Sequence, residues 1–203
     1  MSKYKFRDHQ ITRSCGKKYS DYHSYLPFLL EDFSHHCCYC NMSEKNLDIA
    51  PFQIDHFIPE NTFKGRRDEL QTKYDNLMLS CPKCNRAKSD QYSGDISSPA
   101  IENDYFYNPD FIDYNTIFYR NELGGISSDD EKGKEMIKRL KLYRPIHNYA
   151  WVLEKLDTII ARLEQQIKTS DGETKKNLQS LQEQLMAKHY KMRAHFVATY
   201  HTK

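Results

Sequence analysis

The most regular hydrophobic pattern lies in the last third of the chain. Its apolar positions first recur alternately at three and four residues, which is the spacing of an a/d seam on one helix face. They are Leu153, Leu156, Ile160, Leu163 and Ile167, followed after a polar break at 170–172 by Leu178, Leu181, Leu185, Met192 and Phe196. Two such helices with a short polar turn predict an antiparallel helical hairpin, which either packs on its own domain or docks a partner.

Shorter patterns precede this hairpin. Apolar and aromatic residues recur at helical spacing over 22–33, where Pro27 fits the first turn of a short helix. Residues 49–58 form an extended run interrupted by Pro51, and a later run over 70–79 can bury Leu77 and Leu79. Pro82 suits the first position of a helix continuing to about residue 91.

Turn-forming residues dominate 92–130, so only a short strand or hairpin over 111–118 is expected there. A helix is expected over 129–142. The patterns divide the chain into four parts. They are a basic N-terminal arm with a short helix (1–36), a cysteine-rich core (37–92), a loop-rich extension with a short helix (93–144) and the helical hairpin (145–203).

Composition says more about the cellular location of the protein than about any reaction it catalyses. The 203 residues carry a formal net charge of +2, which neither establishes nor excludes nucleic-acid binding. The basic and aromatic segment 1–20 is either a partly ordered arm or a phosphate-contacting arm. The charged segment 60–72 is an exposed loop that is either solvated or in contact with a phosphate backbone. No apolar run approaches a membrane span and the N-terminus lacks a signal-peptide centre, so a soluble cytoplasmic protein without a membrane partner is expected.

The cysteines indicate a metal site. Of six cysteines, four form two Cys-x-x-Cys pairs, Cys37 with Cys40 and Cys81 with Cys84. The cytosol keeps thiols reduced, and two such turns present four sulfurs that suit tetrahedral zinc. We expect a structural zinc ion here and treat Cys38, which has no matching partner, as a spectator.

Between the pairs lie residues of a different chemistry. The carboxylate of Asp55 and an amide oxygen are hard donors suited to Mg²⁺ or Mn²⁺, whereas His56 can take a proton from water near neutral pH. An Asp-His dipeptide alone is weak evidence. Its position between two cysteine pairs, followed by Asn76 and Asn85, makes the set a strong one.

These motifs together closely resemble the zinc-containing HNH endonucleases. They are Cys37-x-x-Cys40, Ile54-Asp55-His56-Phe57-Ile58-Pro59, Tyr74-Asp75-Asn76-Leu77 and Cys81-x-x-Cys84-Asn85-x-x-Lys88. The resemblance implies an α+β fold, with a treble-clef-like ββα-metal core stapled by zinc and followed by a mainly helical C-terminal region. It also implies catalytic roles: Asp55 and Asn85 as ligands of a divalent ion, His56 as general base, and Asn76 as the residue that fixes the loop between the strands. Asn85 replaces the histidine of the family name.

Lys88 and Arg86 are either substrate-phosphate contacts or exposed helix charges. The expected activity is metal-dependent hydrolysis of DNA, with RNA as an alternative substrate that the sequence does not separate. A non-catalytic zinc module that binds nucleic acid or protein is the competing hypothesis.

A looser resemblance extends beyond the core. Asn108-Pro109, the segment 111–118, Gly124-Gly125-Ile126 and the helix ending before Pro145 are similar to the tail of HNH nucleases found beside ATPases and retrons in bacterial antiphage defence, such as the Septu type. That similarity implies an antiviral role. It would also give the C-terminal helices a use in docking a defence-system ATPase or another protein.

Overall fold

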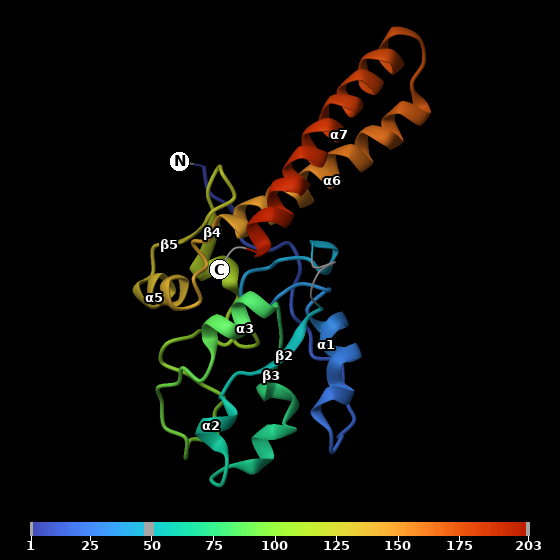
Figure 1. Cartoon of the computed structure of the whole chain (residues 1–203). Coiled ribbons are helices and arrows are strands. Elements are labelled where there is room, and N and C mark those ends of the chain that lie inside the picture. The colour runs from blue at the N-terminus through green and yellow to red at the C-terminus, as the bar shows by residue number, and fades with distance from the viewer. Residues whose placement is uncertain (1, 47–50, 202–203) are drawn as a thin grey trace. The chain divides into compact units, whose positions relative to one another are not determined.

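A computed structural model describes residues 2–46 and 51–201 of the chain (Figure 1). It divides into two compact units, Met1–Tyr143 and Arg144–Lys203. The part of the expected extended run at 49–50 lies outside the described residues.

A two-stranded hairpin and a helix form the centre of the first unit. Strand β2 (Gln53–His56) pairs antiparallel with β3 (Leu77–Ser80), and α3 (Pro82–Lys88) follows β3 directly and packs against β2. All four residues of β3 are buried. Pro82 occupies the first turn of α3 as expected, and the helix ends at Lys88 because Ser89 adopts a positive φ of 49°. The predicted ββα core is confirmed.

The segment between the two strands is more ordered than a plain loop. It contains α2 (Glu60–Phe63) and the 3-10 turns η3 (Asp68–Gln71) and η4 (Tyr74–Asn76). Phe63 and Leu70 are buried and tie these turns to the core. Gly65, with φ of +73°, allows the chain to reverse between α2 and η3.

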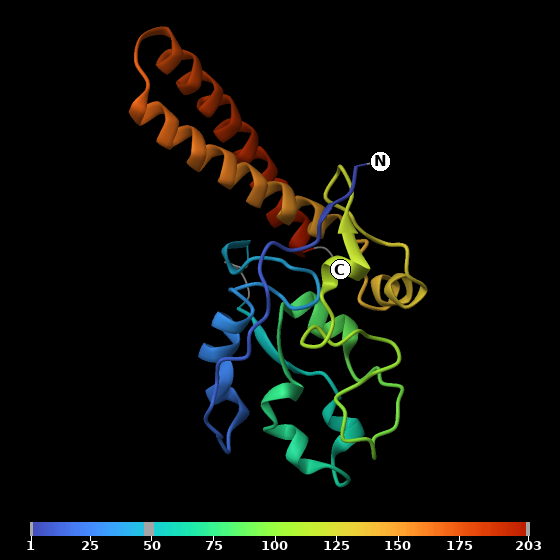
Figure 2. The ribbon, with the colours of Figure 1, turned by 180° about the vertical axis from the view of Figure 1, so that it is seen from behind.

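The N-terminal residues join a second sheet. Strand β1 (Tyr4–Lys5) pairs with β4 (Phe118–Arg120), which pairs with β5 (Ile126–Ser128), all antiparallel. Figure 2 shows the dark-blue N-terminal segment beside the yellow β4 strand. The 3-10 turn η1 (Tyr22–Tyr25) and α1 (Leu26–Asp32) follow, with Pro27 in the first turn of α1 as predicted. Another 3-10 turn, η2, covers Glu44–Asn46.

The expected strand over 111–118 is wrong. Most of this segment forms turns and the short helix α4 (Tyr114–Ile117), because the Asp113 side chain caps it by accepting a hydrogen bond from the Asn115 amide. The strand begins only at Phe118. The helix expected over 129–142 is α5 (Glu131–Arg139), capped by Asp130.

The second unit is the predicted antiparallel hairpin of α6 (Pro145–Thr169) and α7 (Gly172–His201). Leu153 and Leu163 of the expected α6 seam are buried. Leu181 of the expected α7 seam is 44% exposed, and Gln182 occupies the less exposed neighbouring position instead. The α7 seam is therefore partly polar, and His189 within it pairs with Asp157 of α6 at 3.0 Å. None of the helices in the described residues is both long and apolar enough to cross a membrane.

Candidate metal centre and catalytic site

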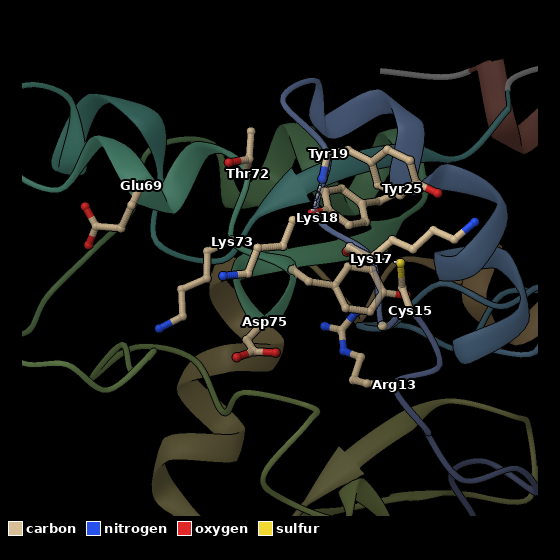
Figure 3. Close-up of a pocket in the computed structure, with 12 residues that line it drawn as sticks. Arg13, Cys15, Lys17, Lys18, Tyr19, Tyr25, Glu69, Thr72, Lys73 and Asp75 are labelled. Atoms are coloured by element: carbon tan, nitrogen blue, oxygen red, sulfur yellow. Dashed lines mark hydrogen bonds between the residues drawn. The ribbon is translucent and has the colours of Figure 1, made fainter.

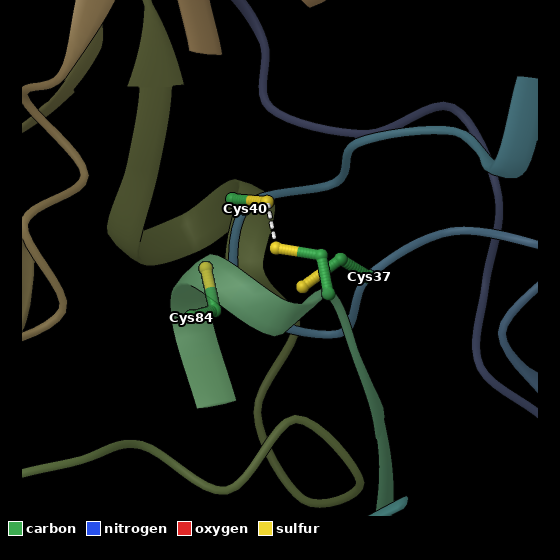
Figure 4. Close-up of side chains that lie close together, drawn as sticks. Cys37, Cys40 and Cys84 are labelled. Carbon is green, nitrogen blue, oxygen red and sulfur yellow. Dashed lines mark hydrogen bonds between the residues drawn. The ribbon is translucent and has the colours of Figure 1, made fainter. Parts of the chain in front are cut away.

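The four paired cysteines form one buried cluster. The Sγ atoms of Cys37, Cys40, Cys81 and Cys84 all lie within 4.8 Å of one another, and Figure 4 shows the labelled side chains converging. The Cys40 and Cys81 sulfurs are 3.8 Å apart. Tetrahedral zinc with Zn–S bonds of about 2.3 Å requires sulfurs about 3.8 Å apart, so the cluster fits zinc.

The environment of these thiols favours a bound cation. Burial, together with the neighbouring Cys37, raises the pKa of the Cys40 thiol well above its ordinary range, whereas, despite burial, hydrogen bonds from the neighbouring cysteines lower the pKa of Cys37. Four buried thiolates at this separation repel one another, so a divalent ion among them is what allows all four to be deprotonated. Cys38 is buried outside the cluster, as expected of a spectator.

Arginines from outside the cysteine-rich segment hold its backbone. Arg7 Nη2 donates to the carbonyl oxygen of Cys38 at 2.8 Å, and Arg120 Nη2 donates to that of Cys40 at 2.7 Å. Both arginines are nearly fully buried, and burial lowers the pKa of Arg7. Sequence reasoning missed them, because the only signal was the mixture of basic and aromatic residues in which both occur.

Asp55 lies at the centre of a buried polar network. Its Oδ2 accepts a hydrogen bond of 2.6 Å from the Tyr39 hydroxyl, and its Oδ1 accepts one of 3.0 Å from Lys88 Nζ. Lys88 Nζ also donates to the His56 carbonyl at 2.7 Å. Burial, with the Asp55 charge, raises the pKa of Tyr39 well above its ordinary range, so the phenol stays protonated and donates.

His56 follows Asp55 on β2 and has its own set of contacts. Its Nε2 lies 2.9 Å from the Gln71 carbonyl oxygen. A carbonyl only accepts hydrogen bonds, so Nε2 carries the proton and the neutral ring has its lone pair on Nδ1. The rings of Tyr22 and Phe63 contact the imidazole edge-on, with centroids 4.9 and 5.6 Å away. The ring is thus fixed in both tautomer and orientation.

Asn76 secures the segment that fixes His56. Its Oδ1 accepts from the Ile58 amide at 2.8 Å, and its Nδ2 donates to the Ile58 and Leu70 carbonyls at 3.2 and 3.1 Å. Asn76 is fully buried. Leu70 directly precedes Gln71, so Asn76 immobilises the peptide next to the carbonyl that holds His56.

The remaining predicted site residues lie on α3. Asn85 is half-buried, and its Nδ2 donates to Gln53 Oε1 at 2.9 Å, which places it over the face of β2 that also carries Asp55. Arg86 is exposed. Lys88 is 0% exposed, and its ammonium group donates hydrogen bonds to Asp55 and to the His56 carbonyl, so it is not available at the surface in this conformation.

A catalytic divalent ion fits this donor set chemically. In the described part of the chain, the cysteine quartet is the one group of three or more His, Cys, Asp or Glu residues close enough to share an ion. Asp55 and Asn85 would therefore supply two oxygens and leave other positions to water or phosphate, which is how Mg²⁺ is usually held. Each Asp55 oxygen keeps a second lone pair beyond its bond to Tyr39 or Lys88, so it can still bind a metal.

Comparison with known proteins agrees with this geometry. Residues 37–91 match the family model of the HNH endonuclease. No curated protein and no solved structure matches the chain.

Proposed function

Residues 37–91 are an HNH endonuclease domain, and from this premise we propose that the protein hydrolyses phosphodiester bonds of DNA with the help of a divalent ion. The domain implies a nuclease-type function and a nucleic-acid substrate. DNA as the polymer, the dependence on a metal and the roles of individual residues are our proposals.

His56 is the general base in this proposal. Its Nδ1 takes a proton from a water molecule as the water oxygen attacks phosphorus, and the bond from phosphorus to the 3′ oxygen breaks. The departing oxygen takes a proton from solvent. The Gln71 carbonyl favours protonation of Nε2, which keeps Nδ1 available as the base.

Asp55 and Asn85 would hold the divalent ion. When bound, such an ion neutralises charge that develops on the phosphate and on the leaving oxygen. Lys88 and Tyr39 keep the Asp55 carboxylate in place. We retain Arg86, which is exposed, as a phosphate contact, whereas phosphate contact by Lys88 would require its buried ammonium to leave Asp55.

One observation carries the proposal: Asn76 binds the Leu70 carbonyl, and the adjacent Gln71 carbonyl binds His56. This relay orients an imidazole with its free nitrogen available, as a positioned general base requires.

The test is cleavage of supercoiled DNA, linear DNA and RNA by the full chain with Mg²⁺ or Mn²⁺. We expect DNA cleavage that His56→Ala abolishes while its zinc content stays at one ion per chain. Binding of Mn²⁺, followed by electron paramagnetic resonance, should weaken in Asn85→Ala. Intact DNA with every divalent ion would contradict the proposal.

The competing function is a non-catalytic zinc module. One observation favours it, because both Asp55 oxygens already accept hydrogen bonds inside the core. That module would bind zinc through the cysteines, show no second Mn²⁺ site and cleave nothing.

We also propose an antiphage role with a partner ATPase, supported by the resemblance of segments 108–145 to defence nucleases. Large apolar side chains exposed on the hairpin suit protein docking. They include Ile159, Leu181, Met186, Tyr190 and Val197. Co-purification with an ATPase that is lost in a Leu181→Glu/Met186→Glu variant would support this role, and an unchanged yield would refute the docking surface.

A further inference from the structure

A cavity of about 580 Å³ lies beside the segment that orients His56. The N-terminal segment 13–19 forms one wall and the segment 69–75 between the two strands forms the other, with Tyr25 of η1 also lining it. Its volume falls within the roughly 300–1,000 Å³ of small-ligand pockets. The catalytic steps proposed above do not use it.

The charge of the cavity is positive. Lys17, Lys18 and Lys73 line it, and within the described residues none of these three has an ion-pair partner. Figure 3 shows the ammonium groups of Lys18 and Lys73 pointing to the same side, with Lys17 pointing to the other. Of the two acids in the lining, Glu69 is already paired with Arg67 at 2.9 Å. Asp75 is exposed and remains as a local negative charge.

Tyr19 and Tyr74 line the cavity as half-buried side chains, whereas Tyr25 is only 2% exposed and packs against both. Tyr74 and Tyr25 pack with centroids 4.9 Å apart, and Tyr19 meets Tyr25 edge-on at 5.0 Å. Their polar ends are engaged, since the Tyr74 hydroxyl donates to Asp32 and the Tyr25 hydroxyl accepts from the Tyr19 amide at 3.0 Å. The cavity therefore combines aromatic surface with lysines, which are the two features that bind an unpaired base and its phosphate.

The cavity is connected to the catalytic histidine in two ways. Thr72 and Lys73 in its wall directly follow Gln71, whose carbonyl holds His56. Tyr22, in the same 3-10 turn as Tyr25, contacts the His56 ring. A strand reaching His56 therefore passes close to the cavity.

We propose that this cavity binds one unpaired nucleotide of the nucleic-acid strand next to the cleavage position. The base lies against the exposed parts of Tyr19 and Tyr74, and the phosphate contacts Lys18 and Lys73. The inference rests on the proposed nuclease function and adds a substrate class to it: a strand that is single-stranded at this point. A paired base stays stacked in its duplex and does not enter such a cavity.

The experiment measures binding in the full-length His56→Ala protein without added divalent ions, so that cleavage plays no part. The probe is a fluorescein-labelled oligo(dT) of about 20 nucleotides, long enough to cover a single-strand site. Each phosphate contact to a single strand contributes a slope of about −0.7 to the dependence of log K on log salt. Lys18→Gln/Lys73→Gln removes both contacts to this one phosphate and should therefore reduce the slope by about 0.7 and weaken binding about 5-fold at about 0.1 M salt.

Matched controls separate the cavity from general charge. Lys138→Gln removes an exposed lysine on α5 that does not line the cavity, and it should leave the affinity unchanged. Asp75→Asn removes the negative charge from the lining and should strengthen binding. A duplex of the same length should bind the double variant and its parent equally.

Three results would overturn the inference. The first is equal oligo(dT) affinity of the double variant and Lys138→Gln. The second is a double variant that loses as much affinity for duplex as for oligo(dT). The third is dTMP binding as tightly as the oligonucleotide, which would identify a free-nucleotide site. Cleavage by the protein with native His56 is scored separately. If the protein cleaves DNA but the lysine substitutions do not change binding, only the nucleotide-binding role of the cavity is refuted. If binding depends on the lysines but no cleavage occurs, only the proposed nuclease function is refuted.

Discussion

Replacement of Asn76 by alanine is the sharpest test of the relay behind His56. The side chain never touches the substrate in the proposed reaction, yet it holds the Ile58 and Leu70 backbone beside the Gln71 carbonyl. Asn76→Ala removes all three hydrogen bonds in a fully buried position. The His56 ring then loses the fixed carbonyl that selects its tautomer.

The size of the effect follows from these bonds. A net contribution of about 1 kcal/mol for each gives a loss of about 3 kcal/mol in the free energy of unfolding, and buried backbone groups left without partners increase it. A misplacement of about 1 Å at a catalytic group costs about 100-fold in rate. We therefore expect kcat to fall about 100-fold, with a smaller change in KM because Asn76 contacts no substrate.

The assay must separate this loss of rate from a loss of folded protein. Urea denaturation gives the folded fraction, and single-turnover cleavage is then measured where each variant is fully folded. Asn108→Ala is the matched control, because Asn108 is also buried and bridges backbone through bonds of 2.9 Å to the Ile101 carbonyl and 3.0 Å from the Asp110 amide. It should lose about 2 kcal/mol of stability and keep its rate. Wild-type kcat in folded Asn76→Ala would refute the relay.

Three further changes test the metal centre, the buried ion pair and the response to acid. Cys81→Ser should contain no zinc by elemental analysis and, like chelator-treated protein, should unfold without a cooperative transition, because zinc binding is coupled to folding. The control Cys38→Ser should retain the ion. Full zinc content in Cys81→Ser would exclude the assigned ligand set. Lys88→Met leaves the buried Asp55 carboxylate without its cation and should lower the free energy of unfolding, measured by urea denaturation, by about 3 kcal/mol. Adding Asp55→Asn should restore part of this loss. An unchanged urea midpoint in Lys88→Met would contradict a stabilising Asp55–Lys88 ion pair. Burial lowers the pKa of His9 to about 4, so on acidification the unfolded chain takes up a proton at His9 before the folded chain does. The free energy of unfolding should therefore fall as the pH drops from about 6.5 to 4. In His9→Gln this fall should be smaller.

The core was predictable because its signals are local. Two Cys-x-x-Cys turns specify four sulfurs irrespective of the path between them, and Pro82 marks the start of a helix whatever lies around it. The hairpin of α6 and α7 was predictable from its periodicity. Its one wrong position, Leu181, shows the limit of that signal, because the structure places the polar Gln182 at the less exposed site.

The supporting contacts were not predictable from pattern. Arg7 and Arg120 lie 31 and 80 residues from the carbonyls to which they donate, and no periodicity encodes a contact at such a separation. The oxygen that orients His56 belongs to the backbone of Gln71, whose side chain carries no information about it. The segment 111–118 failed as a strand because the helix cap of Asp113 outweighed the β propensity of its aromatic residues.

Tyr39 and Lys88 link the cysteine cluster, expected to hold structural zinc, to Asp55, the proposed ligand of the catalytic ion. Tyr39 directly precedes the zinc ligand Cys40, and Lys88 lies one turn beyond Cys84 on α3; both donate to Asp55. The carboxylate assigned to the catalytic ion is therefore positioned by two chain segments that the cysteine cluster fixes. Loss of zinc should accordingly release both donors from Asp55, so a chelator that removes only the structural ion should also weaken Mn²⁺ binding at the proposed catalytic site.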